Sequence, residues 1–166
     1  MAMSPSLLIA GCGDVGGRLA SRLISQGWQV HGLRRSISAL PQGVLPVAGD
    51  LAQSQCPADW PEGPLDYLVY CAAANESSAA GYRAAYIEGL RHVLGWLREH
   101  GQMPRRVLFV SSTSVYGQQG GEWVDESSPV EPEGYSGRIL LEAEQLLLTS
   151  EWPASVVRLS GIYGPG

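Results

Sequence analysis

The sequence predicts an α/β fold in which helices cover both faces of a doubly wound parallel sheet. Unbroken apolar runs at residues 7–10, 67–70 and 107–110 are typical of strands buried on both sides. Between these runs, apolar residues recur every three or four positions, which indicates amphipathic helices. Strands that alternate with helices build βαβ units, and such sheets bind ligands beyond the carboxyl ends of their strands.

The predicted elements alternate along the whole chain. A proline-rich segment at residues 56–64 indicates that one crossover lacks a full helix. Residues 120–134 contain five acids and two prolines, which predicts a surface loop at the carboxyl edge of the sheet. In order, strands are expected at residues 7–10, 29–33, 67–70, 107–110 and around 156–157, and helices around 15–23, 90–97 and 136–149.

The composition is that of one globular domain. The 166 residues are 45% hydrophobic and 16% charged, and their net charge is −5. An acidic chain argues against a nucleic-acid partner, because phosphate binding requires a basic surface. No run approaches the roughly 20 apolar residues of a membrane span, and the chain does not begin like a secretory signal, so we expect a cytoplasmic protein. Three widely spaced cysteines indicate neither a disulfide framework nor a metal site.

A glycine-rich segment, Gly-x-Gly-x-x-Gly at residues 11–16, joins the first strand to the first helix. In this context the glycines permit a tight turn and a close approach of the backbone to a pyrophosphate, while the helix N-terminus offers unpaired N–H groups to the anion. The segment therefore predicts a Rossmann-type dinucleotide site. Its candidate residues are Gly11, Gly13, Asp14, Val15 and Gly16.

The second strand ends at Arg34 and Arg35, followed by Ser36. An NAD-specific site usually has a carboxylate at this position for the ribose 2′-hydroxyl. Two guanidinium groups instead suit a 2′-phosphate, which they bind through bidentate, charge-assisted hydrogen bonds. The sequence therefore favours NADP over NAD, and the alternative is a solvated pair of surface arginines.

Several further segments appear in a recognisable order. Asp50-Leu51 precedes the proline-rich segment, the small residues of 71–74 follow a predicted strand, and Tyr82-x-x-x-Tyr86-Ile87-x-Gly89 precedes a predicted helix. Residues 109–117 read Phe-Val-Ser-Ser-Thr-Ser-Val-Tyr-Gly, and residues 158–166 end in Tyr-Gly-Pro-Gly. Together these motifs make the chain similar to the extended short-chain dehydrogenase/reductase family of the NAD-dependent epimerase/dehydratase type, over essentially its whole length.

The resemblance implies roles for some of these residues. In the family, the Asp-Leu pair contacts adenine, the small residues lie beside the nicotinamide ribose, and a serine bonds the substrate oxygen while hydride moves to or from the nicotinamide. Counting back from Tyr116 selects Ser112 as that serine. The implied cofactor-binding residues are Asp50, Leu51, Ala72, Ala73 and Ala74.

The sequence departs from the family at its Tyr-x-x-x-Lys motif. Tyr135 is followed at the fourth position by Ile139, and the chain contains no lysine. Arg138 is expected to replace the lysine electrostatically, since ionising a tyrosine near neutral pH costs about 4 kcal/mol and a cation at about 4 Å offsets a similar amount. It cannot relay a proton. A second alignment puts Ser136 and Leu140 at the tyrosine and lysine positions, and then no acid–base pair remains.

Two functions remain open from the sequence. The first is an NAD(P)-dependent oxidoreductase or epimerase/dehydratase acting on a hydroxyl or carbonyl of a small substrate, nucleotide-linked or not, with Ser112, Tyr135 and Arg138 as catalytic residues. The second is a non-catalytic NADP(H)-binding or redox-sensing protein. Because the family's chain leaves the sheet near Tyr-Gly-Pro-Gly to build its substrate region, we expect residues 1–166 to be a truncated NAD(P)-binding domain with negligible turnover alone, unless it completes its site as a homodimer.

Overall fold

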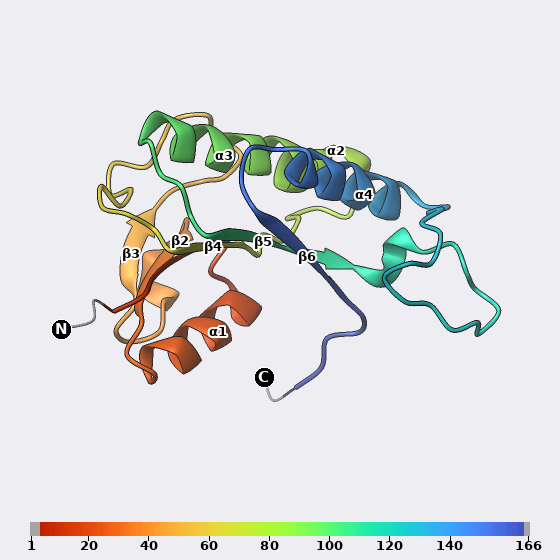
Figure 1. Ribbon diagram of the computed structural model, residues 1–166, viewed down its shortest axis with the longest axis horizontal. Coiled ribbons are helices and arrows are strands. Elements are labelled where there is room, and N and C mark those ends of the chain that lie inside the picture. Colours follow the sequence, from red (N-terminus) through yellow and green to blue (C-terminus); the bar gives the residue numbers. More distant parts are fainter. Residues whose placement is uncertain (1–3, 165–166) are drawn as a thin grey trace.

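The computed structural model describes residues 4–164 and contains six parallel strands in the order β3-β2-β1-β4-β5-β6 (Figure 1). The strands are β1 Ser6–Ala10, β2 Gln29–Arg34, β3 Leu45–Ala48, β4 Tyr67–Tyr70, β5 Arg106–Ser112 and β6 Ala154–Leu159. The helices are α1 Asp14–Ile24, α2 Ala79–Tyr82, α3 Gly89–Glu99 and α4 Tyr135–Leu148, with short turns η1 Ile37–Ala39 and η3 Thr113–Val115 and a π-helical segment η2 Arg83–Glu88.

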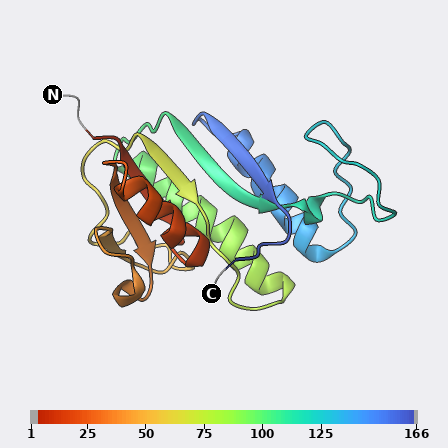
Figure 2. The ribbon, with the colours of Figure 1, turned by 90° about the horizontal axis from the view of Figure 1, so that it is seen from below.

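Helices lie on both faces of the sheet. Figure 1 shows α1 on one face and α2, α3 and α4 on the other, and Figure 2 shows the same arrangement from below. The chain order reverses at β1, which pairs in parallel with β2 on one side and with β4 on the other. This topology confirms the predicted doubly wound sheet, and it creates a crevice beyond the carboxyl ends of β1 and β4.

The alternating side chains of β1 form part of two apolar cores. Leu8 and Ala10 belong to the cluster beneath α3 and α4, whereas Leu7 and Ile9 belong to the cluster beneath α1. All four side chains are at most 2% exposed. A strand buried on both sides in this way reads as an unbroken apolar run, which is why the sequence pattern located it.

Strand β3 was not expected from the sequence. It contains Pro46, which stands opposite Gly32 of β2, and it lies at the edge of the sheet. Proline is compatible with an edge strand because only one side of such a strand needs ladder hydrogen bonds.

The predicted lack of a helix in the proline-rich crossover is confirmed: residues 49–66 contain no helix, although Trp60 and Leu65 are buried in the core.

The π-helical segment η2 results from a contact with the sheet. The hydroxyl of Tyr70 on β4 donates a hydrogen bond to the carbonyl of Ala85. In an α-helix that carbonyl would accept from the N–H of Gly89, which instead donates to Ala84, one residue earlier. A Cβ on Gly89 would clash with the Tyr70 hydroxyl oxygen, so only glycine leaves room for this contact. One turn of the helix is therefore wider than the others.

No helix within residues 4–164 is long and apolar enough to cross a membrane.

Candidate functional site

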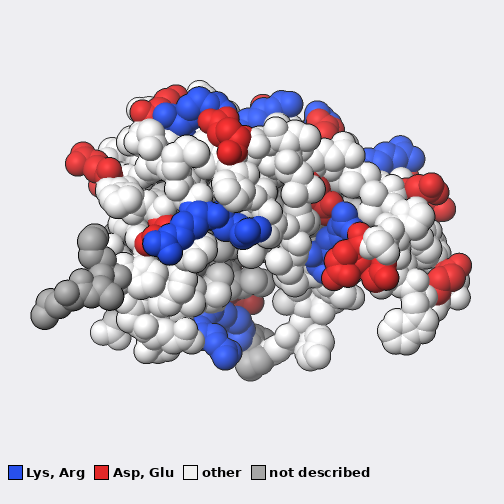
Figure 3. Space-filling view, viewed as in Figure 1, with Lys and Arg blue, Asp and Glu red and all other residues white. Residues whose placement is uncertain are grey.

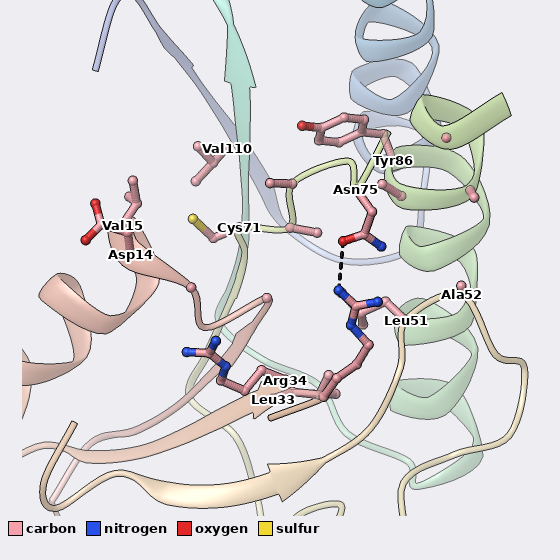
Figure 4. Close-up of a pocket in the computed structure, with 18 of the residues that line it drawn as sticks. Asp14, Val15, Leu33, Arg34, Leu51, Ala52, Cys71, Asn75, Tyr86 and Val110 are labelled. Carbon is pink, nitrogen blue, oxygen red and sulfur yellow. Dashed lines mark hydrogen bonds between the residues drawn. The ribbon is translucent and has the colours of Figure 1, made fainter. Parts of the chain in front are cut away.

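A cavity of about 780 Å³ lies beyond the carboxyl ends of the central strands (Figure 4). It extends from the glycine-rich loop and the end of β2 to the ends of β5 and β6. Of the residues predicted from the sequence, the following line it: Gly11, Gly13, Asp14, Val15, Arg34, Arg35, Asp50, Leu51, Ala72, Ala73 and Ser112. Gly16, Ala74, Tyr135 and Arg138 are not among its lining residues.

The glycine-rich loop forms one wall of the cavity. Gly11 has φ +89°, and a Cβ there would lie 2.6 Å from the backbone of Ala72, so the loop touches the end of β4 directly. Around Gly13, in contrast, a Cβ would meet no atom within 4 Å, and the space is open. Gly16 faces away from the cavity, because a Cβ there would lie 3.0 Å from the Ile9 side chain. Its small size brings α1 close to β1.

The N-terminus of α1 faces the same space. Asp14 and Val15 occupy its first turn and line the cavity. First-turn N–H groups have no acceptor within their own helix, and the helix dipole adds partial positive charge at this end. The Asp14 carboxylate pairs with Arg18 on the next turn at 3.0 Å. The open space at Gly13 therefore adjoins donors suited to a phosphate.

Two arginines mark the β2 end of the cavity. Arg34 Nη1 donates to the backbone carbonyl of Cys12 at 3.2 Å, which ties this guanidinium to the glycine-rich loop. Arg35 Nη2 donates to Asn75 Oδ1 at 2.8 Å across the cavity (Figure 4). Asp50 and Leu51, which follow β3, lie on the same wall. Asn75 was missed by the sequence analysis; its signal was its place directly after the small residues that follow β4.

The β5 end of the cavity combines hydroxyl groups with apolar side chains. Ser112 Oγ accepts a hydrogen bond from the Ser114 N–H at 3.1 Å and so caps the η3 turn. Ser111 Oγ donates to Glu144 Oε1 at 2.6 Å. The remaining wall here consists largely of apolar and aromatic side chains, namely Tyr86, Val110, Leu140, Leu159 and Ile162.

Tyr135 and Arg138 lie in the first turn of α4 and do not meet at the cavity. The Tyr135 side chain is 42% exposed, and its ring packs edge-on against Tyr82 with centroids 5.5 Å apart. Arg138 Nε donates to the Pro132 carbonyl at 3.3 Å, in the loop before the helix. Leu140, in contrast, is 4% exposed and lines the cavity. Leu140, which takes the lysine position in the second alignment, therefore lines the cavity, whereas Ser136, which takes the tyrosine position, does not.

A buried ion pair holds the wall behind the two serines. The Glu144 carboxylate is 1% exposed and accepts two hydrogen bonds from Arg158, from Nη2 at 2.7 Å and from Nε at 3.0 Å. Arg158 Nη1 also donates to the Tyr116 hydroxyl at 3.0 Å, and that hydroxyl donates to the Asp125 carbonyl. The hydrogen bonds that Arg158 donates to the Glu144 carboxylate and to the Tyr116 hydroxyl raise the pKa of Arg158 above its usual value. The pair thus connects α4, β6 and the acidic loop.

The thiols near the cavity are neutral. Figure 4 shows the Cys71 sulfur between Val15 and Val110, and burial raises the pKa of this thiol above its usual value, with a further contribution from Cys12. Burial likewise raises the pKa of Cys12. Neither thiol is therefore a ready thiolate nucleophile near neutral pH. Within residues 4–164, no three His, Cys, Asp or Glu side chains are grouped to hold a metal ion.

The surface charges are mixed. On the face shown in Figure 3, arginines lie among acidic side chains, and neither sign dominates that face. The cavity differs in that its two lining arginines, Arg34 and Arg35, are adjacent at one end. The positive charge available to a ligand is therefore local to the end of β2.

Comparisons with known proteins agree with this geometry. The model of the NAD dependent epimerase/dehydratase family matches residues 7–166. Protein YeeZ of Escherichia coli K12 is 31% identical over 169 aligned positions, covering 95% of this chain and 59% of YeeZ. A candidate NAD-dependent epimerase/dehydratase from Methylobacillus flagellatus is 40% identical, with a TM-score of 0.77 over 98% of this chain and 56% of that one. The Bordetella bronchiseptica enzyme WbmG, solved with NAD and UDP, shares the fold at 20% identity, with a TM-score of 0.77 over 98% of this chain and 55% of its own. The chain spans somewhat more than half the length of these relatives.

Proposed function

Because the chain belongs to the NAD dependent epimerase/dehydratase family, we propose that it binds NADP(H) in this cavity and uses it to oxidise or reduce a hydroxyl or carbonyl group of a small substrate. The observation that carries the proposal is the continuity of the cavity. It runs from an open glycine-rich loop and two arginines at one end to the hydroxyl of Ser112 at the other. A bound nicotinamide dinucleotide would supply or accept a hydride.

The residues at the cavity suit each part of a dinucleotide. Gly13 and the first turn of α1 would hold the pyrophosphate, since that space is open and adjoins unpaired N–H donors. Asp50 and Leu51 would contact the adenosine, and Ala72 and Ala73 the nicotinamide ribose. The bound NAD of WbmG supports a nicotinamide cofactor for this fold, and the preference for NADP rests on Arg34 and Arg35.

The first prediction concerns cofactor choice. Replacing both Arg34 and Arg35 by alanine should weaken NADP binding about a hundredfold, since each charge-assisted hydrogen bond contributes about 1.5–3 kcal/mol. Binding of NAD, which lacks the 2′-phosphate, should change much less. Isothermal titration of both cofactors checks this result. Arg105→Ala is the control, because Arg105 pairs with Asp66 at the opposite edge of the sheet. Equal losses for NADP and NAD would refute the assignment.

The second prediction concerns Ser112. If its hydroxyl bonds the substrate oxygen, Ser112→Ala should lower kcat about a hundredfold or more in the intact protein, while the Kd of the dinucleotide stays within about threefold. Ser114→Ala is the matched control, because that side chain is exposed only two residues further along the chain. Unchanged kcat in Ser112→Ala would remove Ser112 from the reacting site.

A second function has one specific observation in its favour. Leu140 lines the cavity, whereas Tyr135 and Arg138 do not, so the expected acid–base pair has little support from their positions. This arrangement suits a non-catalytic NADP(H)-binding or redox-sensing protein. A nicotinamide absorbance assay of the intact protein with a panel of sugars, ketones and aldehydes distinguishes the two functions. Turnover supports the enzyme, and tight binding without turnover supports the sensor.

Other parts of the assignment stay predictions. They are the role of residues 1–166 as a dinucleotide-binding domain completed by a separate substrate-binding region, the cytoplasmic location and the homodimer. A nucleotide-linked substrate is supported by the UDP bound to WbmG and the UDP-glucose bound to MoeE5.

A further inference from the structure

The phenol that reaches the cavity belongs to Tyr86 rather than to Tyr135. Tyr86 is half-buried and lines the cavity together with Val110, Ser112 and Leu140. Figure 4 shows its ring extending from the helix towards β5, where Val110 lies on the opposite wall. Tyr82 contacts both phenols, with ring centroids 5.3 Å from Tyr86 and 5.5 Å from Tyr135. Tyr135 is therefore on the outer side of this aromatic row.

The wide helical turn determines where Tyr86 points. Tyr86 lies in η2, between Ala85, whose carbonyl accepts from Tyr70, and Gly89, whose N–H donates to Ala84. One additional residue in a turn rotates the preceding side chains about the helix axis relative to a regular α-helix. The ring is then fixed by Tyr82 and by the edge of Phe109, whose centroid is 6.4 Å away. The Tyr86 ring therefore packs against the core of the domain.

The surroundings of Tyr86 keep its hydroxyl protonated. Burial is the main cause that raises the pKa of this phenol, the neighbouring Tyr82 raises it further, and a backbone hydrogen bond from Ala74 opposes the shift. A phenol with a raised pKa donates hydrogen bonds throughout the neutral range but is a poor base. Such a group suits the stabilisation of negative charge on an oxygen, which is the requirement of carbonyl reduction.

We propose that Tyr86 is the catalytic phenol of this cavity and that it donates its proton to the carbonyl oxygen of the substrate. The proposal rests on the proposed function. As the carbonyl carbon accepts a hydride, the Tyr86 O–H bond breaks, its proton bonds the developing alkoxide, and water returns a proton to the phenolate. Ser112 supplies a second hydrogen bond to the same oxygen from the end of β5.

A spectroscopic experiment tests this role independently of turnover. The intact protein is labelled with 3-fluorotyrosine, and the resonances of Tyr86 and Tyr135 are assigned from their loss in Tyr86→Phe and Tyr135→Phe. Addition of NADPH should shift the Tyr86 resonance and leave that of Tyr135 in place. In the carbonyl panel, Tyr86→Phe should lower kcat by about 10²–10⁴-fold, with the Kd of NADPH within about threefold. Tyr135→Phe is the matched control, and melting curves check that each variant is folded.

The outcomes separate this proposal from the one on which it rests. If NADPH binds but only the Tyr135 resonance shifts, or if Tyr86→Phe keeps its kcat, the role of Tyr86 is overturned and the proposed function stands. Binding without any turnover in the intact, unmodified protein overturns the role of Tyr86 and favours the non-catalytic function. Absence of NADPH binding overturns both proposals.

Discussion

Gly11→Ala should lower the free energy of unfolding by roughly 2–4 kcal/mol and the affinity for NADP(H) by at least about tenfold. Two effects combine at this residue. Its φ of +89° is strained for any residue with a Cβ, and that Cβ would lie 2.6 Å from the backbone N and Cα of Ala72. Backbone atoms cannot rotate away as a side chain can. The loop and the end of β4 must separate, and both of them line the cavity.

Gly13→Ala is the matched control for this prediction. Gly13 has φ −83°, and an added Cβ would meet no protein atom within 4 Å. Its stability cost should be about 1 kcal/mol, because alanine is a poorer N-cap residue than glycine. The methyl group would, however, occupy the space assigned to the pyrophosphate, so the loss of NADP(H) affinity should be large. Urea unfolding and isothermal titration of both variants measure the contrast. A Gly11→Ala protein as stable as the unmodified one would contradict this account of the loop.

Arg158→Met should destabilise the fold by about 3 kcal/mol. The variant leaves the Glu144 carboxylate, which is 1% exposed, without its counter-ion and with Ser111 as its remaining side-chain donor. It also removes the hydrogen bond to Tyr116, which connects the pair to the acidic loop. Since Arg158 is itself 21% exposed, entry of water limits the cost to the lower part of the range for broken buried pairs.

Two further variants identify the origin of that cost. Glu144→Leu combined with Arg158→Met removes both charges, and it should recover much of the lost stability if the unpaired buried carboxylate is responsible. Arg91→Met disrupts an exposed pair between α3 and Glu88, the last residue of η2, and should cost about 0.5 kcal/mol or less. Urea denaturation of all three proteins gives the comparison. If Arg158→Met costs no more than Arg91→Met, the buried pair does not stabilise this wall.

The fold was predictable because its main signals are local. The strands of the central sheet are buried on both faces, so β1, β4 and β5 appear as apolar runs, and the glycine-rich loop lies between β1 and α1 as its motif requires. Strand β3 was missed because an edge strand that contains Pro46 has no such run. Its presence depends on pairing with β2, which no window of the sequence reveals.

The site was predictable at its β2 end and less so at its β5 end. Arg34 is the last residue of β2 and Arg35 comes directly after it, so locating the strand also locates both arginines. The orientation of Tyr86, in contrast, depends on a hydrogen bond between Tyr70 and Ala85, which are 15 residues apart. Helical spacing alone placed Arg138 near Tyr135, but it did not show that this face of α4 turns from the cavity.

The wide turn in η2 also makes the residues that can be accepted at positions 70, 86 and 89 depend on one another. Alanine at residue 89 is incompatible with the Tyr70 hydroxyl, whereas with phenylalanine at residue 70 the same alanine would meet no hydroxyl oxygen there. If Tyr70 is replaced by phenylalanine, the N–H of residue 89 can donate a hydrogen bond to the Ala85 carbonyl, as in a regular α-helix. The regular helix would rotate residue 86 away from the cavity. A side chain at residue 89 is therefore expected only in relatives that lack the hydroxyl at residue 70, and in those relatives the phenol at residue 86 would no longer face the cavity.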